Sequence, residues 1–156
     1  MKKILIALDY FPTAQQVAEQ GYAIAKAMHA KTILIHVMAN PNYYISSIYD
    51  PIMGYGGFMH LDFFQSDILA LVKNESNLFL QKTKEHLGSE NISTIVDEGK
   101  IADTILEVAK AKHADMIVMG SHSKSWLEQK LIGSEAETVL HKSTIPILII
   151  PTSKHA

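Results

Sequence analysis

A loop rich in glycine and serine follows a hydrophobic run and precedes a helix-like segment near the end of the chain. Its members are Gly120, Ser121, His122, Ser123, Gly133 and Ser134. A strand that leads into such a loop and then into a helix presents exposed backbone N–H groups and the positive end of the helix dipole, which together attract a phosphate group. The alternative is purely structural: Gly120 ends a strand and Ser134 caps a helix. The spacing alone leaves both interpretations open.

The basic residues narrow the ways in which a phosphate group can be held. All 14 are lysines, because the sequence contains no arginine. Lysine, hydroxyl groups and backbone N–H groups must then replace the bidentate arginine fork. The sequence also has 0 cysteines, which excludes disulfides, cysteine-ligated zinc and cysteine nucleophiles.

Two further candidate site residues are associated with strand-like runs. Asp9 follows the first run, where a carboxylate commonly meets a ribose hydroxyl or a metal-bound water. Its alternative role is to form the turn before Pro12. His36 lies inside an apolar run, and we expect it to be a buried, hydrogen-bonded core histidine rather than a ligand.

The elements that must position these residues alternate along the chain. Continuous apolar runs, typical of strands buried on both faces, occupy residues 4–8, 32–37, 116–119 and 147–150, and a weaker run occupies 92–96. Helical spacing fills the intervals, with capping boxes expected at Thr13–Gln16 and Ser134–Glu137 and a glycine stop at Gly88. This order predicts an α/β fold: a five-stranded parallel open sheet of the flavodoxin or Rossmann kind, flanked by helices on both faces, with a ligand at the carboxyl ends of its strands.

Length and net charge limit the number of domains and the classes of binding partner. The 156 residues fit a single domain, expected over residues 1–152 with a frayed tail at 153–156. The net charge of −2 gives no electrostatic footprint for nucleic acid or for an anionic membrane. No apolar run reaches the length of a membrane span, and the amino terminus does not resemble a secretory signal. A cytoplasmic location is therefore the expectation.

The segment 38–63 interrupts this alternation. It is too aromatic for a disordered linker and longer than most structureless loops. Its aromatic residues are Tyr43, Tyr44, Tyr49, Tyr55, Phe58 and Phe63. It is either a packed loop over one end of the sheet or a lid or partner surface beside the ligand site.

These residues together resemble the universal stress protein family over essentially the whole chain. The resemblance is carried by Ile4-Leu5-Ile6-Ala7-Leu8-Asp9, Leu34-Ile35-His36-Val37, Glu98-Gly99, Ile117-Val118-Met119-Gly120-Ser121-His122, Leu131-Ile132-Gly133-Ser134, Val139-Leu140 and Ile145-Pro146-Ile147-Leu148-Ile149-Ile150. It implies an adenine-nucleotide-alpha-hydrolase-like fold, and many members of the family bind ATP or AMP through a loop of the form Gly-x2-Gly-x9-Gly-[Ser/Thr].

By this similarity, Asp9 faces the ribose, the backbone around Val37 meets the adenine edge, and the loop surrounds the phosphates. The implied nucleotide site comprises Ala7, Leu8, Asp9, Val37, Met119, Gly120, Ser121, His122, Ser123, Gly133, Ser134 and Glu135. Asp9 is also the candidate for placing Mg²⁺ through a bound water. Two positions depart from the family pattern: Ser123 replaces the second motif glycine, and Phe11 stands where a small serine is usual.

The resemblance implies a homodimeric stress-response regulator that binds adenine nucleotide and pairs through its last strand, 145–150. An unpaired hydrophobic edge strand invites such pairing on physical grounds as well. The alternative is a nucleotide-free interaction protein that uses the same fold and the aromatic loop 38–63. The chain lacks the usual dinucleotide, P-loop and nucleophile-elbow signatures, so we expect no catalytic residues and at most slow ATP hydrolysis.

Overall fold

Strands and helices alternate in the computed structural model, which describes residues 1–10, 12–39, 61–121 and 132–152, with side chains described from residue 67 onward in the third of these ranges. The strands are β1 (Lys3–Ala7), β2 (Lys31–Met38), β3 (Ile92–Glu98), β4 (Met116–Gly120) and β5 (Ile147–Ile150). The helices are α1 (Ala14–Ala27), α3 (Leu61–Leu87), α4 (Ile101–Ala111) and α5 (Ser134–Lys142). None of the helices in this described part combines the length and hydrophobicity that a membrane crossing requires.

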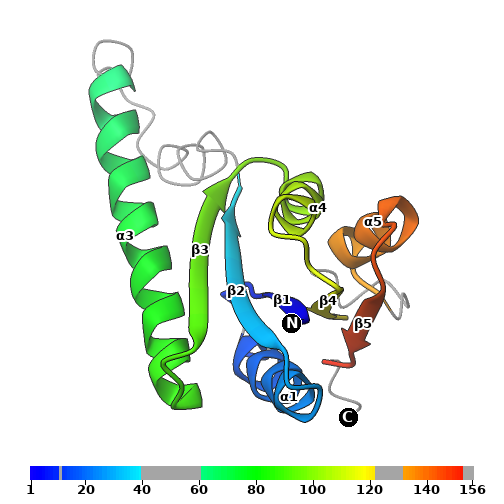
Figure 1. Cartoon of the computed structure of the whole chain (residues 1–156). Helices are drawn as coiled ribbons and strands as arrows, with labels where there is room; N and C mark the ends of the chain where they lie inside the picture. The colour runs from blue at the N-terminus through cyan, green and yellow to red at the C-terminus, as the bar shows by residue number, and fades with distance from the viewer. Residues whose placement is uncertain (11, 40–60, 122–131, 153–156) are drawn as a thin grey trace.

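The five strands form one parallel sheet in the order β3-β2-β1-β4-β5, which confirms the predicted fold class. The chain moves outward from β1 through β2 to β3 and then crosses back to β4 and β5 on the other side of β1 (Figure 1). The topological switch point therefore lies between β1 and β4, where open α/β sheets bind their ligands.

Helices cover both faces of the sheet, and each face has its own hydrophobic cluster. On one face α1 and α3 contribute Val17, Ala18 and Leu80 to a cluster with the strands. On the other face α4 and α5 contribute Ile105 and Val139. Successive strand residues supply opposite clusters because side chains alternate across a sheet. The central strands are thus enclosed on both sides, as their continuous apolar runs predicted.

The glycine stop at Gly88 is confirmed, but the two capping boxes are wrong. Gly88 adopts a φ of 69° after α3 and closes the helix with its N–H. Thr13 is the N-cap of α1 by position, yet its side chain forms no cap hydrogen bond. Ser134 is the first helical residue of α5 rather than its cap, since Gly133 takes that position and donates its own N–H to Ser121 O at 3.0 Å.

The boundary of the aromatic loop also differs from the prediction. Residues 61–63, expected within the loop 38–63, belong to the first turn of α3, and Met38 belongs to β2. Neither Gly nor Pro occurs between residues 61 and 67, so nothing there interrupts a helix. The rest of the expected loop, residues 40–60, and the expected tail at 153–156 lie outside the described residues.

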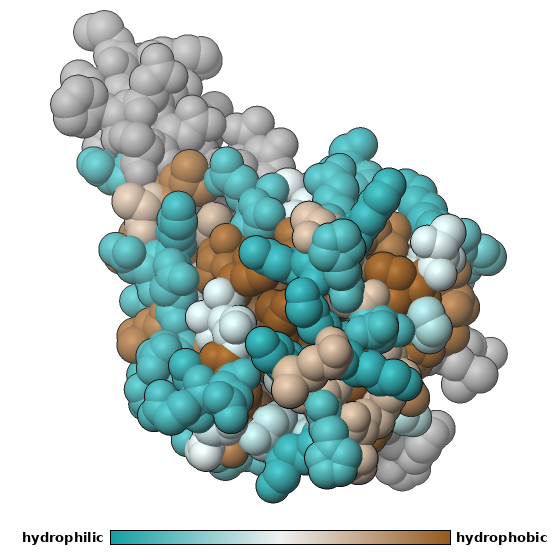
Figure 2. All heavy atoms as spheres, in the orientation of Figure 1, coloured by the Kyte–Doolittle hydropathy of each residue, from teal (hydrophilic) through white to brown (hydrophobic). Residues whose placement is uncertain are grey.

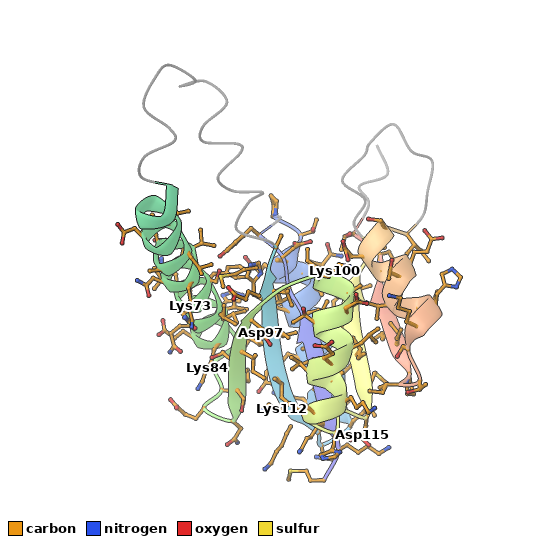
Figure 3. All side chains as sticks on the ribbon, turned by 90° about the horizontal axis from the view of Figure 1, so that it is seen from above. Lys73, Lys84, Asp97, Lys100, Lys112 and Asp115 are labelled. Atoms are coloured by element: carbon orange, nitrogen blue, oxygen red, sulfur yellow. The ribbon has the colours of Figure 1, made fainter. Side chains whose placement is uncertain are left out.

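At the edge of the sheet where the strands begin, Lys3 of β1 forms hydrogen bonds to the segment between α4 and β4. Its backbone N–H donates to Asp115 Oδ2 at 2.8 Å, and its Nζ donates to Lys112 O at 3.0 Å. Lys112 and Asp115 lie together at the end of α4 opposite Lys100 (Figure 3). These contacts lie at the edge where the strands begin. The candidate site residues Asp9 and Gly120 lie at the opposite edge, where β1 and β4 end.

Gly21 sets how closely α1 approaches the sheet. A Cβ at this position would lie 2.9 Å from Ile6 Cδ1 and 3.1 Å from Val118 Cγ1. Both contacts are tighter than normal packing allows, so a larger side chain must push α1 away from β1 and β4. The spacing of α1 from the sheet therefore depends on the absence of a side chain here.

We expect Gly21→Val to lower the free energy of unfolding by about 1–3 kcal/mol through overpacking. The matched control is Ala23→Val on the exposed side of α1, which costs only the difference in helix propensity, about 0.6 kcal/mol. Urea denaturation of both variants measures the difference. Equal stability of the two variants would contradict the close approach at Gly21.

Candidate functional site

A pocket opens at the switch point, between the carboxyl ends of β1 and β4. It is a small, open depression: about 200 Å³ lies between its lining atoms when the open solvent at its mouth is counted. Its lining residues are Ala7, Leu8, Asp9, Thr13, Ala14, Val17, Gly120 and Thr152. Four of them, at positions 7, 8, 9 and 120, belong to the site that the sequence predicts.

Gly120 allows three elements to converge at the base of this pocket. A Cβ on Gly120 would lie 3.0 Å from Val17 Cγ2 of α1 and 3.1 Å from Thr152 Cγ2, which follows β5. Both distances are tighter than ordinary van der Waals contact, so any side chain here forces α1 or the segment after β5 to move. The glycine that the sequence singled out is thus required for close packing at the pocket itself.

Hydrogen bonds join the pocket to the edge strand β5. Ser121 N donates to Ile150 O at 2.9 Å, and Thr152 N donates to the buried Ser121 Oγ at 3.0 Å. The carbonyl of Ser121 also receives the Gly133 N–H at the start of α5. Ser121 therefore ties together the end of β4, the residues after β5 and the N-terminus of α5.

The sequence analysis missed Thr13, Ala14, Val17 and Thr152 as pocket residues. Thr13 drew attention only as a helix cap, and Thr152 follows the last strand next to the expected tail. Their contribution depends on how α1 and β5 pack at the end of β4, which no local motif encodes. The parallel order of strands was the one available signal, because it places the residues after β1, β4 and β5 at the same edge.

The N-terminus of α1 lies at the pocket and contributes the partial positive charge of a helix N-terminus. The first turn of α1 carries no acidic residue, and its first N–H groups have no partner within the helix. Thr13 and Ala14 from this end line the pocket together with the exposed Asp9. The wall formed by α1 thus carries partial positive charge, whereas the end of β1 carries a carboxylate.

The backbone of Val37 faces past the end of β1. The ladder between β1 and β2 finishes with Ala7 opposite Ile35, and Leu8 N donates to Ile35 O at 2.9 Å. In a parallel ladder the amide and carbonyl groups of alternate residues face the same neighbour. Val37 therefore directs its N–H and C=O toward the β1 side of β2, one step beyond the paired strand.

His36 is a buried core histidine, which confirms the interpretation from sequence. Its side chain is 4% exposed, and its Nδ1–H donates to Leu8 O at 2.8 Å. The ring lies 4.3 Å from that of Tyr10 and 5.8 Å from that of Phe79 in α3, measured between centroids. Tyr10 in turn shares a hydrogen bond with the buried Ser76 of α3. His36 thus connects the end of β1 to an aromatic cluster under α3.

Burial lowers the pKa of His36 below its ordinary value of 6.5. The hydrogen bond to the Leu8 carbonyl and the negative charge of Asp9 act in the opposite direction and are outweighed. Because the carbonyl can only accept, the neutral ring carries its proton on Nδ1. Nε2 is buried and has no hydrogen-bond partner among the described residues.

The other predicted site residues that the structure describes do not line the pocket. Ser134 is exposed at the start of α5, where it does not cap its own helix. Glu135 Oε2 accepts a hydrogen bond from Ala102 N at 3.1 Å, so its carboxylate sits at the N-terminus of α4. The side chain of Met119 packs in the hydrophobic cluster under α4 and α5. His122 and Ser123, and with them the Ser123 departure from the family motif, lie outside the described residues, as does Phe11.

A tightly held metal ion finds no ready ligand set in the described residues. No group of three or more His, Asp or Glu side chains converges there. Asp9 supplies one carboxylate at the pocket, which suits Mg²⁺ only in the form that keeps several waters and binds mainly through phosphate oxygens. The donor set therefore fits a metal that arrives with a phosphorylated ligand.

Fold and pocket together define an open α/β protein with a pocket at the switch point of a parallel sheet. A model of the universal stress protein family matches residues 1–151. The chain belongs to this family.

Two curated relatives come from Methanocaldococcus jannaschii. Universal stress protein MJ0531 is 32% identical over 156 residues, which cover 98% of this chain and 84% of the relative. Universal stress protein MJ0577 is 26% identical over 152 residues, which cover 96% and 94%. The solved structure of MJ0577 superposes with a TM-score of 0.76 at 25% identity and covers 99% of this chain and 98% of its own.

Two solved relatives contain adenine nucleotides. A universal stress protein in complex with cAMP gives a TM-score of 0.63 at 21% identity and covers 97% of this chain and 98% of its own. The universal stress protein from Archaeoglobus fulgidus in complex with dAMP gives 0.58 at 18% identity, with coverages of 96% and 97%. At these identities the likeness establishes the shared fold.

The buried, neutral state of His36 predicts a loss of stability at mildly acidic pH. Between the lowered pKa of the folded state and 6.5, the unfolded chain binds a proton that the folded chain does not. The free energy of unfolding therefore falls as the pH drops below about 6.5, by up to about 1.4 kcal/mol per pH unit. Above this pH His36 has no effect on the pH dependence.

Urea denaturation of the wild type and of His36→Asn between pH 5 and pH 8 measures this effect. The asparagine keeps an N–H donor for the Leu8 carbonyl but does not titrate, so its profile lacks the His36 contribution. Identical pH profiles for the two proteins would contradict the assignment of a lowered pKa to His36.

Proposed function

We propose that the protein is a stress-response regulator that binds an adenine nucleotide, ATP or AMP, in the pocket between β1 and β4. The observation that carries the proposal is the convergence of Asp9 and Gly120 on one pocket at the switch point of the sheet. This edge is where open parallel sheets bind their ligands. The family membership and the relatives in complex with cAMP and dAMP support adenine as the base.

In this proposal each part of the site meets one part of the nucleotide. Asp9 accepts hydrogen bonds from the ribose hydroxyls, and the outward-facing backbone of Val37 pairs with the adenine edge. The phosphates extend toward the loop from Gly120 to Ser134, with Gly120, Ser121, His122, Ser123, Gly133, Ser134 and Glu135 as its expected contacts. Ser134 is available for this role because it is exposed and does not cap α5.

The absence of arginine fixes how the phosphates are held. Backbone N–H groups of the loop, the N-termini of α1 and α5, and serine and threonine hydroxyls replace a guanidinium fork. Mg²⁺, when it accompanies ATP, neutralises phosphate charge, and Asp9 holds it through a coordinated water. A cytoplasmic location completes the proposal, since a chain with 0 cysteines gains nothing from an oxidising compartment.

Nucleotide titration tests this proposal directly. At a nucleotide concentration about 100 times the dissociation constant, binding stabilises the folded state by about 2.7 kcal/mol. For a chain of this size we expect the melting temperature to rise by roughly 5–10 °C. Asp9→Asn removes the carboxylate charge and should weaken AMP binding about tenfold, as measured by calorimetric titration.

Asp67→Asn is the matched control, because Asp67 is an exposed carboxylate on α3 and lies outside the pocket lining. It should bind AMP like the wild type. No thermal shift and no binding heat with millimolar AMP or ATP, with or without Mg²⁺, would refute the nucleotide proposal. That result would favour the nucleotide-free interaction protein instead.

The second part of the proposal is a homodimer formed through the strand segment 145–150. β5 is an edge of the sheet, and on its inner side it pairs only with β4. Ile147, Leu148 and Ile149 remain partly exposed, and hydrophobic surface is visible near α5 in Figure 2. Leu140 of α5 is 48% exposed. An unpaired hydrophobic edge beside further apolar surface suits pairing with a second copy.

The alternation of backbone groups identifies a variant that blocks such pairing selectively. Pro146 O accepts a hydrogen bond from Ile117 N of β4, and Ile150 O accepts one from Ser121 N directly after β4. The N–H of Ile149 therefore faces the open edge. Ile149→Pro removes this outward N–H without removing a bond to β4. We expect light scattering to show twice the 17.3 kDa chain mass for the wild type and the monomer mass for the variant.

Thr94→Pro on β3 is the control at the opposite edge of the sheet. The N–H of Thr94 also faces outward, because Met38 O and Gly99 N mark the residues that pair across β2 and β3. This variant should remain dimeric. A monomeric wild type at micromolar concentration, or dissociation by both proline variants, would contradict pairing through β5.

A further inference from the structure

The hydrogen bond between His36 and Leu8 stands where the β1–β2 ladder should continue. After Leu8 N donates to Ile35 O, regular parallel pairing would direct the Val37 N–H to Leu8 O. The Leu8 carbonyl instead receives the Nδ1–H of His36 at 2.8 Å. Within the described residues, no backbone hydrogen bond joins Val37 to Leu8. Among the described residues, the donor to the Leu8 carbonyl is thus a side chain and not the backbone amide that would extend the ladder.

This substitution has consequences on both strands. On β2 the Val37 N–H stays directed at the space beyond β1. On β1 the planar trans peptide couples the Leu8 carbonyl to the Asp9 N–H on its opposite side. Holding the carbonyl toward β2 therefore directs the Asp9 amide toward β4 and the pocket, which Leu8 and Asp9 line.

The His36 side chain is well suited to hold this arrangement. It is 4% exposed and lies against the Tyr10 ring at 4.3 Å between centroids, so it has little freedom to leave the Leu8 carbonyl. Phe79 meets the His36 ring only edge-on, at 5.8 Å between centroids. Tyr10 follows Asp9 directly and is itself joined to Ser76 of α3. The cluster thus anchors the chain on the far side of Asp9 as well.

We propose that His36 is a positioning residue of the nucleotide site, which takes the Leu8 carbonyl and so leaves the Val37 amide open to the adenine edge. This inference rests on the proposed function, because it needs a nucleotide to use that amide. His36 acts through Leu8 and Val37 and does not touch the ligand. When the His36 donor is removed, the Val37 N–H bonds to Leu8 O and extends the β1–β2 ladder by one hydrogen bond. The amide is then no longer available to the adenine base.

The test compares variants that keep or remove the donor at position 36. His36→Phe retains a ring against Tyr10 and Phe79 but has no N–H, whereas His36→Asn keeps an N–H at the place of Nδ1. We expect H36F to bind AMP about tenfold more weakly than the wild type and H36N to bind within about twofold of it. His36→Leu is a second variant without the donor, for use if the phenylalanine does not fit the core.

A second measurement reports on the backbone without any ligand. Amide hydrogen exchange of Val37 in the free protein should be slower, relative to Ile35, in H36F or H36L than in the wild type. This slowing follows from the new bond to Leu8 O. H36N should exchange like the wild type. A merely structural loss of packing would speed exchange across β2 rather than slow it at one amide.

Phe79→Leu is the control for general disturbance of the cluster, because it alters the ring contacts and leaves the Leu8 bond in place. It should leave AMP affinity and Val37 exchange unchanged. Unaltered AMP binding in both H36F and H36L, failure of H36N to restore it, or an equal loss in Phe79→Leu would overturn the role of His36. A wild type that binds no AMP would instead refute the proposed function on which the inference rests.

Discussion

The pocket depends on β1 lying at the centre of the sheet, between two neighbours that the chain reaches in opposite directions. From β1 the chain moves outward to β2 and β3 before it crosses to β4 and β5. The connections after β1 and β4 therefore lead to opposite faces of the sheet, and a crevice is expected at the carboxyl ends of these two strands. Close packing then defines the shape of that crevice. Gly21 allows α1 to approach the sheet, and Gly120 allows α1 and the segment after β5 to meet at the end of β4.

Backbone groups do much of the work that charged side chains perform in other nucleotide sites. Without arginine, the nucleotide site that we propose relies on helix N-termini, loop N–H groups and hydroxyls to attract phosphate. Backbone groups are also central at the end of β1. There the His36 side chain donates to the Leu8 carbonyl, and in our proposal this leaves the Val37 N–H directed outward. Ser121 extends this network to β5 through the Ile150 carbonyl and the Thr152 amide. Hydrogen bonds of Ser121 thus connect the pocket residue Thr152 to β5, the strand that we propose for dimerisation.

The sequence predicted the fold closely, because apolar runs and helical spacing report directly on burial in a parallel sheet. It predicted that His36, inside the buried strand β2, belongs to the core. It also predicted that Asp9 and Gly120 meet, because they stand at the carboxyl ends of the neighbouring strands β1 and β4. It missed Thr13 and Thr152, whose place in the pocket arises only when α1 and β5 pack at the end of β4. The capping boxes failed because a Ser or Thr with Glu or Gln three residues later is a local pattern. At α5, the bond from Gly133 N to Ser121 O instead sets the start of the helix.

The central claim is that an adenine nucleotide binds across the carboxyl ends of β1, β2 and β4. Titration of isotope-labelled protein with AMP, followed through backbone amide resonances, tests it at the level of single residues. We expect the resonances of Leu8, Asp9, Val37 and Gly120 to shift together and to saturate with one dissociation constant, while those of Lys3 and Asp115 at the opposite edge stay in place. Shifts confined to the amino edge or to β3, or no shifts at millimolar AMP, would contradict it.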